Sequence, residues 1–224
     1  DFTFTPNISM DLRNNNTEVF WNPLVGDGAG TNGYKSQTTN TIRSYTFNQL
    51  LTYNKTIGLH NFSALVGHEN YSYNFRTFSA DRNNLIARGN TEFPNFVTSL
   101  SSTGRADNDR IESYLSKFSY SYNDKYFMDA SLRRDGSSRF SPNRRWGTFF
   151  SVGGSWAIKK ENFLKESSWI DDLRLKVSYG QVGNNAILES DGSARYYGDR
   201  AFFDLGLNSN VEGGVLLATV ATPD

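Results

Sequence analysis

Apolar and polar residues alternate with a period of two along most of the chain, which is the pattern of β-strands with two unlike faces. The first segment carries its apolar residues at every second position: Phe2, Phe4, Pro6, Ile8, Met10 and Leu12. The polar, Gly-rich residues 14–38 predict a loop, and the alternation returns over residues 40–54. A short turn is predicted at residues 55–58, where the pattern is interrupted.

The third segment begins near residue 62 and contains a change of parity. Its apolar residues are even-numbered before Gly67 and odd-numbered after it: Phe62, Ala64 and Val66, then Tyr71, Tyr73 and Phe75. One inserted residue would produce this change, so the sequence predicts a β-bulge near Gly67. The polar stretch at residues 79–109 then predicts a second long loop.

Four more alternating segments precede residue 180. They cover residues 114–122, 126–133, 146–158 and 172–179. A tight turn is predicted at residues 123–125, a loop at residues 135–143, and a connector with a helical turn at residues 159–171. After Gly180 the chain is expected to be loop-like, with residues 215–220 as the start of an eighth strand.

The lengths of these segments and of their connections favour an all-β transmembrane barrel over a soluble β-sandwich. The segments run to about 9–15 residues, whereas strands of soluble proteins average about 5–6. Short and long connections alternate, as the turns and outer loops of outer-membrane barrels do. Aromatic residues gather at segment ends, namely Tyr120, Tyr122, Tyr126, Trp146 and Trp156. Periodicity alone leaves both architectures open, because each uses strands with one apolar and one polar face.

Composition and charge exclude several classes of function. The chain has 224 residues with 23 basic and 23 acidic side chains, so it lacks the basic surplus of a nucleic-acid binder. It contains no cysteine, which excludes disulfide scaffolds and Cys-ligated metals, and only two histidines, His60 and His68. Its mean hydropathy of -0.57 and the lack of a long apolar run exclude a transmembrane helix. No catalytic set of side chains stands out, so we expect neither an enzyme nor a cofactor.

The ends of the sequence resemble those of an internal piece. Asp1 already lies inside the alternation, and neither an initiator Met nor an apolar leader precedes it. Residues 221–224 carry no strand pattern. We therefore expect the chain to be part of a longer protein.

Two long motifs carry a family resemblance. Residues 126–140 read YFMDASLRRDGSSRF, and residues 143–152 read NRRWGTFFSV. Both closely resemble signatures of the SusC/RagA-like TonB-dependent outer-membrane transporters. Further runs resemble the same family: GSW at 154–156, ENFL at 161–164, LRLKVSYGQVGN at 173–184, WNPLVGDG at 21–28 and YNKT at 53–56. The resemblance covers most of residues 20–185.

The resemblance implies a segment of about seven or eight strands from a 22-stranded barrel in the bacterial outer membrane. Residues 1–224 would then be part of a single β-barrel domain, with the plug domain and TonB box absent from this sequence. Expected partners are a SusD-like lipoprotein over the barrel mouth, TonB, the protein's own plug domain and outer-membrane lipid. The family's two-barrel assemblies imply a dimer of SusC–SusD pairs. The implied activity is the import of oligosaccharides or peptides, driven by TonB, in Bacteroidetes-type bacteria.

Candidate functional residues fall into three groups within this frame. Charges expected at the extracellular mouth are Arg133, Arg134, Asp135, Arg139, Arg144 and Arg145. Residues of the polar parity, expected to face the lumen, are Asp129, Arg174 and Lys176. Loop aromatics that would stack on sugar rings are Trp21, Tyr34, Tyr196 and Tyr197. Each group also has a structural interpretation, in which arginines pair with nearby acids and loop aromatics pack within their own loops.

Two weaker motifs are set aside, and two rival functions stay open. Residues 28–36 faintly resemble a phosphate-binding loop, but Tyr34 breaks the spacing. Residues 107–109 supply too few oxygens for a calcium site. The rivals to the transporter are a passive, porin-like barrel and a soluble β-sandwich that binds carbohydrate. The sequence does not distinguish a glycan cargo from a peptide cargo.

Overall fold

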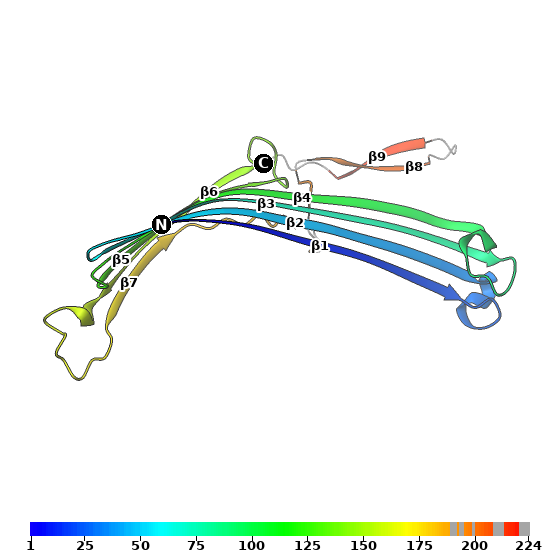
Figure 1. Cartoon of the computed structure of the whole chain (residues 1–224). Coiled ribbons are helices and arrows are strands. Elements are labelled where there is room, and N and C mark those ends of the chain that lie inside the picture. The colour runs from blue at the N-terminus through cyan, green and yellow to red at the C-terminus, as the bar shows by residue number, and fades with distance from the viewer. Residues whose placement is uncertain (189–191, 193–194, 199, 208–212, 220–224) are drawn as a thin grey trace. The chain divides into compact units, whose positions relative to one another are not determined.

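The protein is all-β, as the sequence predicts. The computed structural model describes residues 1–188, 192, 195–198, 200–207 and 213–219. Seven strands form one antiparallel sheet in the order of the chain (Figure 1). They are β1 (Phe2–Trp21), β2 (Tyr34–Ile57), β3 (His60–Leu85), β4 (Phe96–Tyr122), β5 (Tyr126–Ser137), β6 (Trp146–Ala157) and β7 (Arg174–Gly180).

The remaining elements are short. Three 3-10 helices lie in the connections: η1 (Gly26–Thr31), η2 (Phe93–Asn95) and η3 (Ile158–Lys160). None of the helices in the described part of the chain has the length and hydropathy that crossing a bilayer requires. β8 (Phe202–Leu207) and β9 (Gly213–Thr219) pair with each other in a separate two-stranded sheet. β8 was not predicted, whereas β9 overlaps the expected eighth strand, whose residue 220 lies outside the described residues.

The two long loops predicted at residues 14–38 and 79–109 are present but much shorter, covering only residues 22–33 and 86–95. β1 continues to Trp21, and only residues 86–95 separate β3 from β4. The apolar alternation stops in these stretches, yet the backbone continues in the sheet. Polar side chains pair across the strands instead, as Lys35 does with Glu18 and Thr41 with Asn14. A strand with two polar faces gives no alternation to detect, although its backbone hydrogen bonds are the same.

The β-bulge predicted near Gly67 is also wrong. The rings of His60 and Tyr122 are 4.7 Å apart, and the Ser101 hydroxyl donates to Asp81 at 2.5 Å. In each pair the two residues lie equally far along the chain from the middle of the β3–β4 connection. The pairing of β3 with β4 is therefore the same at both places, and neither strand contains an extra residue between them. The aromatic side chains therefore change from one face of β3 to the other, and the strand keeps its register.

The chain divides into two compact units, which we describe separately. One comprises residues 9–45 and 72–108, and the other comprises residues 1–8, 46–71 and 109–224. In the first, the β1–β2 connection and the end of β3 are tied together, because the Leu85 amide donates to Asn32 O at 2.8 Å. A side chain at Gly28 would collide with the backbone of Asn22, which explains a glycine in the WNPLVGDG run.

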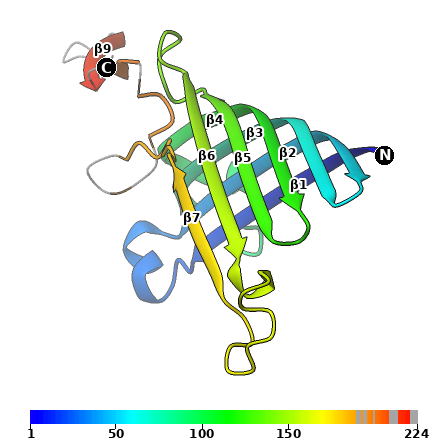
Figure 2. The same cartoon turned by 90° about the vertical axis from the view of Figure 1, so that its left-hand side faces the viewer.

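The second unit contains the regular part of the sheet. Figure 2 shows the β4–β5 turn and the β6–β7 connection at one end of these strands, and the β5–β6 loop at the other. The predicted tight turn is confirmed, with Asn123 and Asp124 at φ 51 and 49. The predicted helical turn is confirmed as well, since the Lys165 amide donates to Glu161 O at 2.8 Å.

One face of β4–β7 is apolar and exposed. The register pairs Tyr126 with Trp156, Ala130 with Val152, and Leu132 with Phe150 on this face. Leu132 is 50% exposed, and the buried hydrophobic residues among those described are only Leu85, Phe96 and Ala157. A β-sandwich would cover this face with a second sheet, and no second sheet covers it in the described part of the chain.

Two rows of rings bound this apolar face. One row crosses four strands at the short-turn end and consists of His60, Tyr122, Tyr126 and Trp156. The other lies toward the loop end and consists of His68, Tyr114 and Trp146. Trp146 and Trp156 are the two ends of the β6 face, about 33 Å apart along the strand at about 3.3 Å per residue. A tilt of about 40° reduces this spacing to about 25 Å, the height of the apolar band of an outer-membrane barrel.

Candidate functional site

The opposite face of β4–β7 is polar, and we call it the polar face. Asp129 lies opposite Gly153, and Lys176 lies opposite Ser155. The Ser119 hydroxyl donates to Asp129 at 2.6 Å. The predicted lumen-facing residues Asp129, Arg174 and Lys176 therefore share one face of the sheet. Small side chains surround them, since glycine and serine occupy most polar-face positions of β6.

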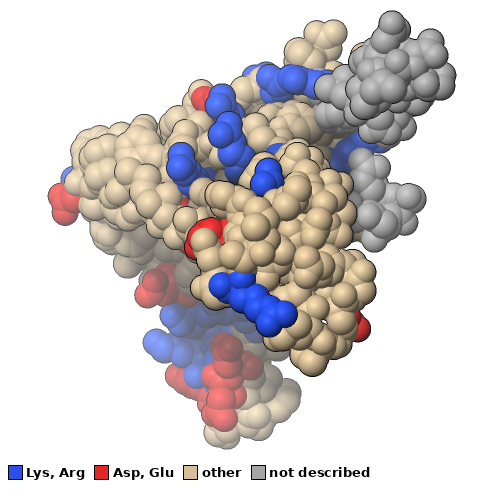
Figure 3. Space-filling model, turned by 90° about the vertical axis from the view of Figure 1, so that its right-hand side faces the viewer, with Lys and Arg blue, Asp and Glu red and all other residues tan. Residues whose placement is uncertain are grey.

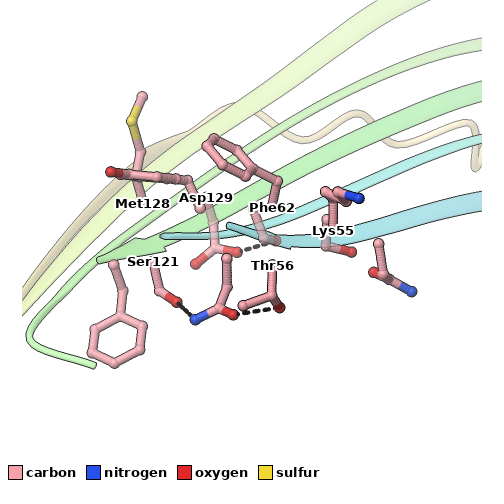
Figure 4. Close-up of a pocket in the computed structure, with 12 residues that line it drawn as sticks. Lys55, Thr56, Phe62, Ser121, Met128 and Asp129 are labelled. Carbon is pink, nitrogen blue, oxygen red and sulfur yellow. Dashed lines mark hydrogen bonds between the residues drawn. The ribbon is translucent and has the colours of Figure 1, made fainter. Parts of the chain in front are cut away.

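A pocket of about 360 Å³, lined by both polar and apolar side chains, lies at the short-turn end of the sheet (Figure 4). Thr56 donates to Asn61 at 2.8 Å, and Asn61 donates to Ser121 at 3.3 Å. Figure 4 shows Asp129 and Ser121 on one side of the strands and Met128 on the other. Most polar side chains of the lining, among them Asn61, Ser121 and Asp129, thus already have hydrogen-bond partners.

Arg133 is the most highly connected charge of the polar face. Its Nε donates to both carboxylate oxygens of Asp135, at 2.7 and 2.9 Å. Its Nη2 lies 3.1 Å from the Ser113 hydroxyl and 3.5 Å from Glu69 Oε1. Because these partners lie on β3, β4 and β5, the Arg133 guanidinium cross-links three strands.

Arg139 forms a buried ion pair that fixes the β5–β6 loop, residues 138–145. Its Nη2 and Nε donate to Asp109 Oδ2 at 2.7 and 3.0 Å, and the two side chains are 14% and 5% exposed. The Ser138 amide donates to Arg110 O at 2.9 Å, and the Arg110 amide returns a bond to the Ser138 hydroxyl. Arg139 therefore holds the loop against β4.

The six predicted mouth charges do not form one cluster. Arg133, Asp135, Arg144 and Arg145 line a cavity of about 450 Å³ beside the β5–β6 loop. Arg139 is committed to Asp109, as described above. Arg134 lies on the apolar face, 5.4 Å from the centre of the Trp146 ring. Consecutive residues of β5 point to opposite faces, so the RRD run divides its charges between them.

The predicted loop aromatics each contact a neighbour. The rings of Trp21 and Tyr34 are 4.4 Å apart at the ends of β1 and β2. Arg139 lies over Tyr196 at 5.0 Å, and Arg200 lies over Tyr197 at 5.7 Å. Trp21 and Tyr34 pack within the β1–β2 hairpin, as the structural interpretation expects, whereas Tyr196 contacts Arg139 of a different loop.

The β6–β7 connection is anchored by Glu161. Its carboxylate accepts hydrogen bonds from Tyr126 at 2.6 Å, from Lys125 at 3.0 Å and from Trp156 at 3.1 Å. Hydrogen bonds from Tyr126, Lys125 and Trp156 stabilise the charged form and lower the pKa of the Glu161 carboxyl to about 2. Glu161 thus ties the connection to the row of rings at the short-turn end.

Charges of both signs lie close together on part of the face that Figure 3 draws. Figure 3 shows charged side chains in separate groups among mostly uncharged ones, with acidic and basic side chains intermixed in the lower group. Asp107 pairs with Arg105 at 3.0 Å, so the acids of residues 107–109 are used in ion pairs. Among the described residues, no group of three His, Asp or Glu side chains is placed to hold a metal ion.

Comparisons with known proteins place this sheet in a family. The chain is 31% identical over 155 residues to the TonB-dependent receptor SusC of Bacteroides thetaiotaomicron, covering 69% of this chain. It is 32% identical over 203 residues to the TonB-dependent receptor P39 of Formosa agariphila, covering 87% of this chain. The chain belongs to the SusC-like TonB-dependent receptors. No family model matches it.

Solved structures agree with this assignment to the SusC-like receptors. A structure of the RagAB peptide transporter matches all of the chain with a TM-score of 0.88 and 28% identity. The RagAB peptide importer in its 'open-open' state matches with a TM-score of 0.79 and 27% identity. The chain spans 15% of SusC, 19% of P39 and 24% of the RagAB chain.

Membership of this family indicates what surrounds the faces of the sheet. The sheet of this SusC-like chain is part of an outer-membrane β-barrel, so its apolar face, between the two rows of rings, meets lipid. The relatives carry the names of receptors and transporters rather than enzymes, which is consistent with the expectation of no catalysis.

Several functional contacts of this SusC-like chain were missed from the sequence. The partners of the arginines lie far away in the chain: Glu69 is 64 residues from Arg133, and Asp109 is 30 residues from Arg139. The pair of Lys35 and Glu18 was missed too, although Lys35 is only 2% exposed. The alternation of side chains along β4 would have placed Ser113 on the polar face, but nothing in the sequence marked this serine as a partner of Arg133.

Proposed function

We propose that this chain is part of the wall of a TonB-dependent importer of oligosaccharides or peptides. The observation that supports this function is the sheet's pair of unlike faces. An apolar face about 25 Å high suits lipid, and a polar face with Asp129, Arg133, Arg174 and Lys176 suits a water-filled passage. In this proposal residues 1–224 form part of a single β-barrel domain.

The residues of the polar face have two roles in this proposal. Asp129, Arg174 and Lys176 face the lumen, where they contact the plug domain or passing cargo. Arg133, Asp135, Arg144 and Arg145 lie toward the loop end, at the extracellular mouth. Arg134 is not included, because it lies on the apolar face over Trp146.

The proposed partners follow from the relatives. The curated relatives are TonB-dependent receptors, which supports coupling of this protein to TonB through its plug domain. The similarity to RagAB, a two-component peptide transporter, supports a SusD-like lipoprotein over the barrel mouth and a dimer of such pairs. The same similarity is the reason to propose peptides, as well as oligosaccharides, as cargo.

Uptake measurements on the full-length protein test this function. Cells carrying the intact gene should take up labelled oligosaccharides or peptides that a deletion strain does not. A protonophore should abolish that uptake, because TonB draws on the inner-membrane proton gradient. Uptake that persists unchanged with the protonophore would support the passive, porin-like barrel instead. A protein that leaves the membrane fraction without detergent would contradict both barrels.

A further inference from the structure

The cavity beside the β5–β6 loop combines a suitable size with an unusual lining. Its volume of about 450 Å³ lies within the range of about 300–1,000 Å³ found for small-molecule sites. The lining includes three arginines, Arg133, Arg144 and Arg145, and one acid, Asp135. Phe149 contributes apolar surface, and Asn184 and Asn185 contribute amides.

The charges of the lining do not cancel. Arg133 adds no free positive charge, because its Nε donates two hydrogen bonds to Asp135 and its Nη2 lies 3.5 Å from Glu69, which is outside the lining. Arg145 adds a positive charge, and the described residues of the lining hold no second carboxylate to balance it. The lining therefore presents an excess of positive charge to any occupant.

Arg145 also carries a polar atom without a partner. Its Nε is buried, and no hydrogen-bond acceptor reaches it in the described part of the chain. A buried donor of a charged group that lacks an acceptor costs free energy, and an acceptor that enters the cavity recovers it. Arg145 lies at the end of the β5–β6 loop and lines the cavity together with Arg133 and Asp135 of the polar face.

We propose that this cavity is a subsite for a carboxylate group of the cargo, with Arg145 as its principal donor. A guanidinium presents its N–H groups as a planar fork that matches the two oxygens of a carboxylate. The same fork also matches the oxygens of a phosphate, so inorganic phosphate is the competing anion to compare in the titration. The carboxylate comes from a uronic acid of a glycan or from an acidic residue of a peptide. The inference rests on the proposed importer function and names a chemical class for its cargo.

Matched acidic and neutral probes test the subsite on the full-length protein in detergent. One pair is the methyl glycoside of galacturonic acid, with its carboxylate free and ionised, against methyl galactoside. The other is N-acetyl-Gly-Glu-amide against N-acetyl-Gly-Gln-amide. Calorimetric titration should show that the acid of at least one pair binds about tenfold more tightly than its neutral partner. The pair that shows the preference identifies the source of the carboxylate.

Three substitutions separate the roles of the arginines. Arg145→Gln should abolish the preference for the acid, so that the acidic and the neutral probe bind with equal affinity. Arg145→Lys keeps the charge without the planar fork, so it should retain part of the preference for the acid. This variant replaces Arg145→Gln in the test if Arg145→Gln does not fold. Arg134→Gln, on the opposite face of the same sheet, should keep the full preference.

The outcomes also separate this inference from the proposed function. Equal affinity for acidic and neutral probes, or tighter binding of phosphate than of either acid, overturns the carboxylate subsite whatever the uptake results show. A retained preference in Arg145→Gln overturns the role of Arg145. A preference without any energised uptake would support the subsite and contradict the importer.

Discussion

Breaking the ion pair of Asp109 and Arg139 should release the β5–β6 loop from β4. Arg139→Met removes the guanidinium but keeps most of the side-chain volume, which leaves the Asp109 carboxylate 5% exposed and without its cation. Removing one partner of a buried ion pair costs about 3–5 kcal/mol. This cost raises the free energy of the closed loop but not of the open loop, because opening returns the Asp109 carboxylate to water.

Hydrogen exchange measures this local opening directly. The Ser138 amide, bonded to Arg110 O at 2.9 Å, exchanges only when the loop leaves β4. A loss of about 3–5 kcal/mol corresponds to exchange that is faster by about a hundredfold to a few thousandfold. Mass spectrometry of the full-length receptor in detergent should find this change in peptides that cover residues 137–139. Peptides that cover residues 118–122 should exchange as in the wild type.

A second variant distinguishes charge from packing. Asp109→Leu combined with Arg139→Met replaces the pair by apolar side chains, which is often neutral for stability, so exchange should return close to the wild-type rate. Exchange in Arg139→Met that stays within about threefold of the wild type would refute the argument. The loop would then be held by its backbone hydrogen bonds alone.

Three further predictions concern other parts of the second unit. Gly67→Val should destabilise the sheet by about 1–3 kcal/mol in urea unfolding, because an added Cβ would meet Leu50 at 2.6 Å and Leu115 at 3.1 Å; unchanged stability would contradict the close packing. The pKa of Glu161 is lowered to about 2, so its contribution to stability is complete above about pH 4.5 and is lost as the pH falls toward 2; exchange in residues 161–165 should follow this range and lose the dependence in Glu161→Gln. Leu132→Arg on the apolar face should cost about 2–4 kcal/mol for folding into vesicles, whereas Ser131→Arg on the polar face should cost less than half as much; equal costs would contradict the assignment of the two faces.

The strands that face lipid on one side were predictable from the sequence. Residues 146–158 alternate cleanly and residues 126–133 do so apart from Phe127, because one face must be apolar against lipid while the other is polar. Period-two alternation fixes which side chains share a face, so the parity of the strands is enough to group Asp129, Arg174 and Lys176. The motifs around residues 133–146 also pointed to the correct family.

The remaining errors have a common physical cause. Outside the apolar band both faces of a strand meet polar surroundings, and residues 14–21 and 96–109 then look like loops. The change of aromatic parity at Gly67 marks the end of that band and not a bulge. Site contacts such as Arg133 with Glu69 depend on sheet register across distant residues, which a single sequence does not encode locally.

Thiol labelling at two consecutive residues of β5 tests the central claim most directly. The chain has no cysteine, so Ala130→Cys and Ser131→Cys, introduced separately, add the first thiols to this segment. In the full-length receptor in lipid nanodiscs, a charged, membrane-impermeant thiol reagent should modify Ser131→Cys at least about tenfold faster than Ala130→Cys, because a thiol buried in lipid does not ionise. Equal rates, or faster modification of Ala130→Cys, would contradict a barrel wall with lipid on one face and an aqueous passage on the other.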